Sequence, residues 1–218
     1  MVSMKNSRSP RWRRRAALIL VLAVAAGVGV RHVSRRRAPP APPPPPVPAA
    51  APRVHRVMRV AGPVLAICMD DFGFSLKSAR RVCALPCRLT CAIIPLTGFA
   101  TKTAEMAAAV GKEVFIHMPM QPTYRLPDVP EYSVVIGAGL SPDEIADRIA
   151  RARASVPGAA GMNNHEGSLA TEDPELMAHV MAVLGPLEFC FLDSMTTVNT
   201  TAWKAARDAG LCWGKNGD

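Results

Sequence analysis

The sequence between residues 60 and 218 predicts an α/β fold built on a parallel sheet. Short apolar runs alternate along this stretch with longer segments that carry helix-capping residues. Alternation of strands and helices implies parallel strands joined by right-handed crossovers. An open doubly wound sheet and a (β/α) barrel both fit this pattern. In either one, the functional residues lie at the carboxyl ends of the strands.

Six short apolar runs predict the strands. Runs that are apolar throughout, such as Val64–Met69, are typical of parallel strands buried on both faces. In chain order, the expected strands cover residues 64–69, 89–94, 113–116, 159–162, 187–192 and 211–213. Residues 118–140 are rich in Pro and Gly and predict a long loop.

Capping residues mark the expected helices between these strands. Ser75 and Asp173 suit N-caps, and Gly111 suits the position just after a helix. Ser141 and Glu144 form a capping box. The expected helices cover residues 75–85, 101–110, 142–154, 174–184 and 200–209.

The first 59 residues differ in composition from the rest of the chain. Residues 1–37 hold ten Lys or Arg residues and no Asp or Glu, around an apolar run over residues 16–30. This pattern is typical of a signal peptide or a short membrane anchor, so we expect a periplasmic or otherwise extracytoplasmic, membrane-anchored protein. The Pro-rich residues 38–59 predict an extended linker to a domain over residues 60–218.

The basic charge of the chain belongs to this N-terminal segment. The whole chain carries a formal net charge of +9, but residues 53–218 hold sixteen Lys or Arg residues against seventeen Asp or Glu. A globular part that is close to neutral lacks the basic patch of a nucleic-acid-binding domain. We therefore expect no nucleic acid among the partners.

Polar side chains follow four of the expected strands. They are Asp70, Asp71, His117, Asn163, Asn164, His165 and Asp193. Because the carboxyl ends of parallel strands meet at one edge of a sheet, we expect these side chains to converge. Two imidazoles and one carboxylate bind Zn²⁺ or a similar divalent ion and leave a position open for water. A second carboxylate beside the ion can then accept a proton from that water.

Each of these residues also has a structural interpretation when it is taken alone. Adjacent Asp70 and Asp71 are more often a turn or a helix cap, and a lone His117 or His165 is more often a buried structural histidine. Asp193 suits an N-cap or a group that orients its neighbours. The combination of these residues, rather than any one of them, predicts a metal site.

Five segments around these residues resemble the divergent polysaccharide deacetylase family, distant relatives of the NodB-type carbohydrate esterases. The segments are Ala66–Gly73, Ala92–Pro95, His117–Pro122, Gly158–Ser168 and Phe191–Thr197. The resemblance implies a distorted (β/α) barrel of the NodB-like type. By position, it also implies that Asp71, His117 and His165 bind the metal and that Asp70 is the catalytic base.

The chain departs from the pattern of the resembled family at several points. Members usually have Glu where Gln121 stands, Met where Glu166 stands and Arg where Met195 stands. Members also continue through further βα units beyond the position of Asp218. We therefore expect a barrel that is truncated at its carboxyl end and leaves a sheet edge unpaired.

These observations predict a metal-dependent hydrolase that removes acetyl groups from an envelope polysaccharide or a peptidoglycan-like glycan. Zinc is the expected ion. The residues of the expected site are catalytic Asp70 and Asp193, metal-binding Asp71, His117 and His165, and substrate-binding Asn163 and Asn164. The alternative is a non-catalytic carbohydrate-binding or envelope-assembly protein on the same fold. A phosphoesterase fits less well, because it would need more carboxylates and a second metal ion.

Overall fold

The computed structural model describes residues 65–217. The predicted anchor over residues 16–30 and the predicted linker over residues 38–59 lie outside this range. Within it, no helix is both long enough and apolar enough to cross a membrane.

Six parallel strands form one sheet, and their order in the sheet is their order in the sequence. They are β1 (Cys68–Phe72), β2 (Thr90–Ile93), β3 (Glu113–Met120), β4 (Gly161–Glu166), β5 (Cys190–Asp193) and β6 (Trp213–Lys215). All neighbouring pairs are parallel. The α/β fold class predicted from the sequence is confirmed.

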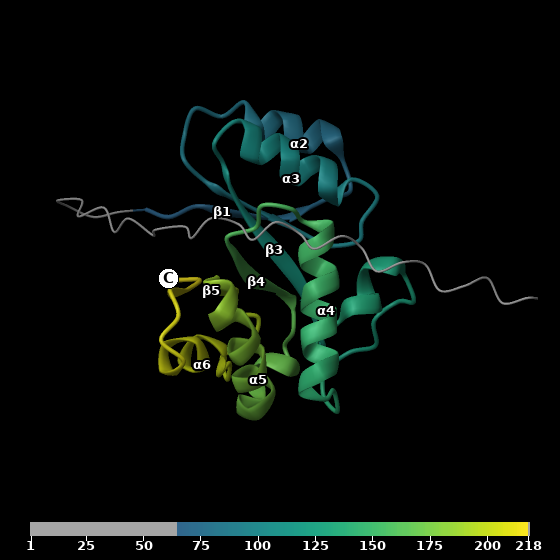
Figure 1. The fold of residues 1–218 in the computed structure, drawn as a ribbon, viewed down its shortest axis with the longest axis vertical. Coiled ribbons are helices and arrows are strands. Elements are labelled where there is room, and N and C mark those ends of the chain that lie inside the picture. Colours follow the sequence, from purple (N-terminus) through teal and green to yellow (C-terminus); the bar gives the residue numbers. More distant parts are fainter. Residues whose placement is uncertain (1–64, 218) are drawn as a thin grey trace, which may run out of the picture. The chain divides into compact units, whose positions relative to one another are not determined.

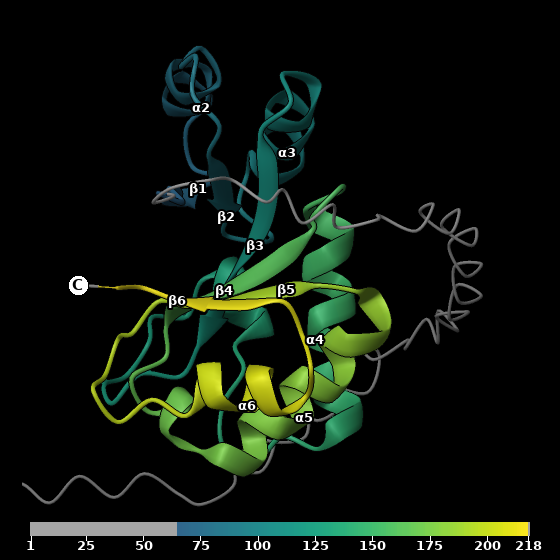
Figure 2. The same ribbon diagram turned by 90° about the vertical axis from the view of Figure 1, so that its left-hand side faces the viewer.

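Helices connect these strands along one face of the sheet. They are α2 (Leu76–Cys83), α3 (Ala100–Ala109), α4 (Pro142–Ser155), α5 (Pro174–Leu184) and α6 (Ala202–Asp208) (Figure 1). Right-handed crossovers between strands in sequential order place every helix on the same face, and α4, α5 and α6 lie on one side of β4–β6 (Figure 2). This is the arrangement of a (β/α) barrel. In a doubly wound sheet the strand order reverses and helices cover both faces.

The predicted capping residues begin and end these helices as expected. The Ser75 hydroxyl accepts a hydrogen bond from the Ser78 N–H at the start of α2, and Asp173 accepts two N–H bonds at the start of α5. The Ser141–Glu144 capping box is complete at the start of α4. Gly111 follows α3 with φ +73°, the left-handed conformation that Gly adopts without strain.

Strands β1, β3 and β4 continue further than the apolar runs predicted. β3 ends at Met120 rather than at residue 116, and β4 covers residues 161–166 rather than 159–162. The ladder passes through the polar pair His117↔Asn163 and reaches Met120↔Glu166. The polar residues therefore lie within the last few residues of the strands, because backbone pairing does not require an apolar side chain.

The two faces of the sheet bury different side chains. On the face covered by helices, Val114, Ile116 and Met118 of β3 belong to the main hydrophobic core. On the inner face, Phe115 packs in a small cluster with Ala92 and Ala160. Side chains alternate along a strand, so His117, two residues after Phe115, lies on the inner face.

Candidate metal centre

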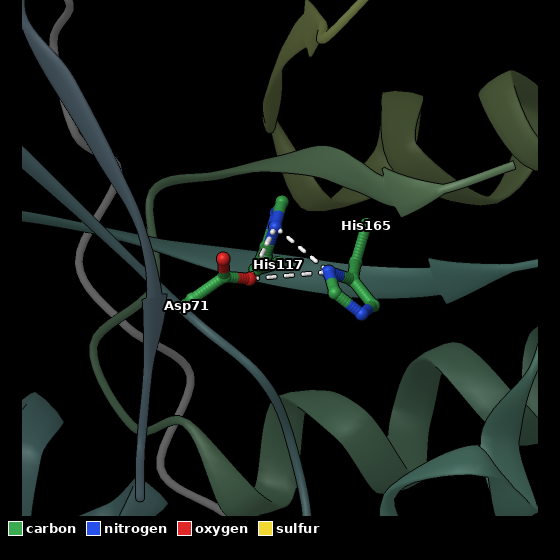
Figure 3. Close-up of side chains that lie close together, drawn as sticks. All are labelled: Asp71, His117 and His165. Atoms are coloured by element: carbon green, nitrogen blue, oxygen red, sulfur yellow. Dashed lines mark hydrogen bonds and ion pairs between the residues drawn. The ribbon is translucent and has the colours of Figure 1, made fainter. Parts of the chain in front are cut away.

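Three of the predicted side chains converge at the carboxyl ends of the strands. Asp71 comes from β1, His117 from β3 and His165 from β4, and they point toward one another (Figure 3). Asp71 Oδ1 lies 3.3 Å from His117 Nε2 and 3.2 Å from His165 Nδ1. The two nitrogens are themselves 3.2 Å apart.

The spacing of these three atoms fits one divalent ion. A tetrahedral ion with ligand bonds of about 2.0–2.2 Å holds its ligand atoms about 3.3–3.6 Å from one another. The observed distances of 3.2, 3.2 and 3.3 Å are close to that spacing. Two imidazoles and one carboxylate are also the donor types that zinc and similar ions bind in proteins.

A bulge in β1 brings Asp71 to the cluster. The register between β1 and β2 shifts between Met69 and Phe72, and Asp71 has φ +62°. In a regular strand Asp70 and Asp71 would face opposite sides of the sheet. The bulge and the left-handed backbone let both carboxylates reach the inner face, at a conformational cost that Asp tolerates better than most residues.

His117 is buried and held by a side-chain partner. Its Nδ1 lies 2.9 Å from Asn163 Oδ1, and the Asn163 amide donates to Asp70 Oδ1 at 2.9 Å. Because Oδ1 of an amide only accepts, His117 Nδ1 carries the hydrogen and Nε2 presents its lone pair to the cluster. Asn163 therefore orients a candidate ligand, as outer partners of metal-binding histidines commonly do.

The protonation states of the cluster favour metal binding. The His117 imidazole, whose Nε2 lies 3.3 Å from Asp71 Oδ1, holds the pKa of Asp71 below its ordinary value of 3.8. Burial, and then the nearby His117, lowers the pKa of His165 below its ordinary value of 6.5. Asp71 is therefore ionised and His165 neutral at pH 7, which are the states in which both bind a cation.

Asp70, the predicted base, lies beside the cluster. Its Oδ1 accepts from the Asn163 amide and from the Cys68 thiol, and it lies 4.0 Å from His117 Nδ1. Its side chain is 37% exposed, so solvent and a ligand can reach it.

Asn163 and Asn164 are fully buried and already hydrogen bonded. Asn164 accepts from the Ser194 N–H and donates to the Glu166 carbonyl, so it joins the ends of β4 and β5. Neither amide presents surface to a ligand in the described structure. The substrate contact expected of both residues stays a prediction, and their observed contacts position the strand ends.

Asp193 is not one of the three clustered side chains. Its carboxylate is fully buried, and it accepts from the Met195 N–H, the Thr200 hydroxyl and the Trp203 N–H. These bonds join the end of β5 to the first turn of α6. Its catalytic role stays a prediction, while its contacts are those of a group that orients its neighbours.

Tyr132 contacts the cluster but was not among the residues predicted from the sequence. Its hydroxyl lies 3.3 Å from His165 Nε2, and its ring stacks on the His165 ring with a centroid distance of 6.2 Å. Tyr132 belongs to the short 3₁₀ helix Pro130–Val134 in the long loop after β3. No local pattern marks a loop residue that approaches a strand end through tertiary folding.

The sequential parallel sheet, the helices on one face and the His–His–Asp cluster at the strand ends define a barrel-type α/β protein with a candidate metal centre. A family model described as divergent polysaccharide deacetylase matches residues 67–217, and the chain belongs to this family. The resemblance noted from the sequence is confirmed.

Two similar proteins of known sequence are described as uncharacterised. The chain is 38% identical over 150 residues to a protein of Haemophilus influenzae and 36% identical over 159 residues to protein YibQ of Escherichia coli. The alignments cover 67% and 71% of this chain, and 51% and 49% of the relatives. The chain thus spans about half the length of the curated relatives it matches.

A solved structure has the same fold. It is an uncharacterised protein from Agrobacterium tumefaciens C58, with a TM-score of 0.62 and 20% sequence identity. The match covers 69% of this chain and 61% of that chain. At this identity the similarity supports the fold alone.

Proposed function

We propose that the protein is a metal-dependent hydrolase that removes acetyl groups from an envelope polysaccharide. The observation that carries this proposal is the triangle of Asp71, His117 and His165, with ligand atoms 3.2–3.3 Å apart at the carboxyl ends of the strands. Membership of the divergent polysaccharide deacetylase family supports a glycan as the substrate.

The side chains of the site would divide the reaction between them. Asp71, His117 and His165 would hold the ion, and zinc suits this donor set. The ion would polarise the acetyl carbonyl and lower the pKa of a water molecule. Asp70 lies on the inner face beside His117 and is reachable from solvent, so it would accept the proton of the attacking water. Asn163 holds both Asp70 and His117 in place.

Metal content and acetate release test this proposal together. The purified full chain should bind about one divalent ion and release acetate from N-acetylated chito-oligosaccharide or peptidoglycan. His117→Ala should lose both properties, because it removes a ligand. His179→Ala is the matched control, since His179 lies within α5, away from the strand ends, and both properties should survive there. Acetate release by metal-free protein, or undiminished release by His117→Ala, would contradict the proposal.

A second candidate function is glycan binding without hydrolysis. Among residues 65–217 the histidines are His117, His165 and His179, and the first two are the candidate ligands. No imidazole of the described chain therefore remains at the site to protonate a leaving amine. Asp70→Asn separates the two candidates: it should abolish acetate release and leave the bound ion in place if the protein is a hydrolase.

A further inference from the structure

A long groove lies next to the metal cluster, formed by the loop that follows β3. Residues between Gln121 and Val135 line it, and its volume is about 1130 Å³. Pockets for small ligands measure about 300–1,000 Å³. The groove is therefore large enough for an extended ligand of several rings.

Tyr132 connects this groove to the metal cluster. Its ring lines the groove, and its hydroxyl lies 3.3 Å from His165 Nε2. The other nitrogen of His165, Nδ1, is 3.2 Å from Asp71 Oδ1. A ligand in the groove thus lies one side chain away from the position of the ion.

Helix α4 holds this wall of the groove in place. The Arg148 guanidinium donates to the Val135 carbonyl, and the Arg151 guanidinium donates to the Ser133 hydroxyl. Both acceptors follow Tyr132 closely in the sequence, so the two bonds hold the segment just after it. The wall is therefore ordered before a ligand arrives, which lowers the entropy lost on binding.

Two tyrosines, Tyr124 and Tyr132, line the groove. Tyr124 is 59% exposed, and a hydrogen bond with Glu166 raises its pKa to about 12. The charge of Glu166 also contributes, after burial, to a raised pKa of Tyr132. Glu166 Oε2 is buried and has no hydrogen-bond partner among the described residues. This oxygen retains an acceptor position that a donor would satisfy.

The charges of the groove lining balance. Arg125 and Asp128 are the ionisable pair among the lining side chains apart from the tyrosines. A lining with one positive and one negative side chain does not favour a polyanion. The exposed Tyr124 ring and the half-buried Tyr132 ring each offer an apolar face and a hydroxyl, which suit the apolar C–H face and the hydroxyl groups of a neutral sugar ring.

We propose that the groove binds the sugar rings next to the reacting ring of a neutral, N-acetylated glycan, through Tyr124 and Tyr132. The class of ligand rests on the proposed function, while the site itself rests on the groove and its continuity with His165. The groove would then determine how many sugar rings of the glycan must lie beside the ring that carries the acetyl group. The metal cluster would act on the acetyl group itself.

Binding without turnover tests this site separately from hydrolysis. Penta-N-acetylchitopentaose is titrated calorimetrically into the full chain treated with EDTA, and zinc content is measured in parallel on untreated protein. Tyr124→Ala should weaken binding about ten-fold, the loss of one well-placed aromatic contact, and leave zinc content unchanged. Leu85→Ala is the control, since it removes an exposed apolar side chain that precedes β2, at the opposite end of the strands.

The outcomes separate this proposal from the proposed function. Binding that Tyr124→Ala weakens, without acetate release under any divalent ion, keeps the groove and removes the hydrolase. Acetate release with an unchanged Michaelis constant in Tyr124→Ala keeps the hydrolase and overturns the groove. Undetectable binding of the pentaose, or tighter binding of a polyanionic glycan such as hyaluronan, also overturns it.

Discussion

A relay of hydrogen bonds sets the chemistry of the metal cluster at the scale of single residues. It runs from Asp70 through the amide of Asn163 to His117 Nδ1. Asn163 both donates and accepts in this relay, because its amide carries a donor nitrogen and an acceptor oxygen. The lone pair of His117 Nε2 is therefore directed at the cluster before any ion is present.

Replacement of Asn163 by Ala should weaken metal binding without removing a ligand. Loss of the outer partner of a metal-binding histidine costs about 10–100-fold in affinity. Competition with a chromophoric chelator measures the affinity. Asn216→Ala removes an exposed amide beyond β6 and should leave the affinity unchanged. Equal affinities for both variants would show that Asn163 does not orient His117.

Gly161, two residues before Asn163, lies where the Phe115 ring and the Cys190 carbonyl leave no space for a side chain. A Cβ built there would lie 2.5 Å from Phe115 Cζ and 2.6 Å from the Cys190 carbonyl oxygen. Because the second neighbour is backbone of an adjacent strand, Gly161→Ala should reduce the free energy of unfolding by about 1–3 kcal/mol in urea titration. Gly185→Ala is the control, since a Cβ there meets nothing within 4 Å, and its unfolding free energy should not fall.

At the scale of elements, helix starts were predicted better than strand ends. Ser75, Asp173 and the Ser141–Glu144 pair act through bonds to the next few residues, so a local sequence carries the signal. Strand ends were placed at the last apolar residue, which stopped β4 before Asn163 and His165. Those polar side chains interrupt the apolar pattern but not the ladder.

The candidate metal ligands were predictable for a related reason, and the rest of the site was not. Sequential strands bring the Asp70–Asp71 pair, His117 and His165 to one edge of the sheet, which a topology argument foresees. The choice of Asp71 over Asp70 as the ligand came from the family resemblance. No sequence pattern around Asp70 and Asp71 predicts the bulge in β1 that turns the Asp71 side chain toward the inner face. The approach of Tyr132 to His165 depends on how α4 holds the preceding loop.

The capping box of α4 gives a prediction on stability. Ser141→Ala should lower the free energy of unfolding by about 1 kcal/mol at pH 7.

The backbone N–H of Ser141 is the main cause of the lowered pKa of Glu144. A carboxylate with a lowered pKa stabilises the fold above its ordinary pKa and loses that effect as the pH falls through the lowered value. The loss of unfolding free energy caused by Glu144→Ala should therefore shrink between pH 5 and pH 3 in urea titrations. A loss that stays constant over this pH range would contradict the prediction.

At the scale of the whole molecule, the proposed function depends on the cellular compartment that contains the domain over residues 60–218. The basic residues 1–37 and their apolar run predict export or anchoring, which the described residues 65–217 do not test. We propose an extracytoplasmic location, since an envelope glycan lies there. Alkaline phosphatase, which is active only after export, should be active when fused after residue 59. An inactive fusion that accumulates inside the cell would contradict this location.

Asp71 is the exposed member of the candidate cluster, and it lies on an edge strand of the described sheet. His117 and His165 stand on adjacent strands inside the sheet, whereas Asp71 sits on the bulge of β1, with its side chain 66% exposed. The two imidazoles are mostly buried, with 5% and 19% of their side chains exposed. Of the three candidate ligands, Asp71 is therefore the one most open to solvent, and an ion would reach the cluster from its side.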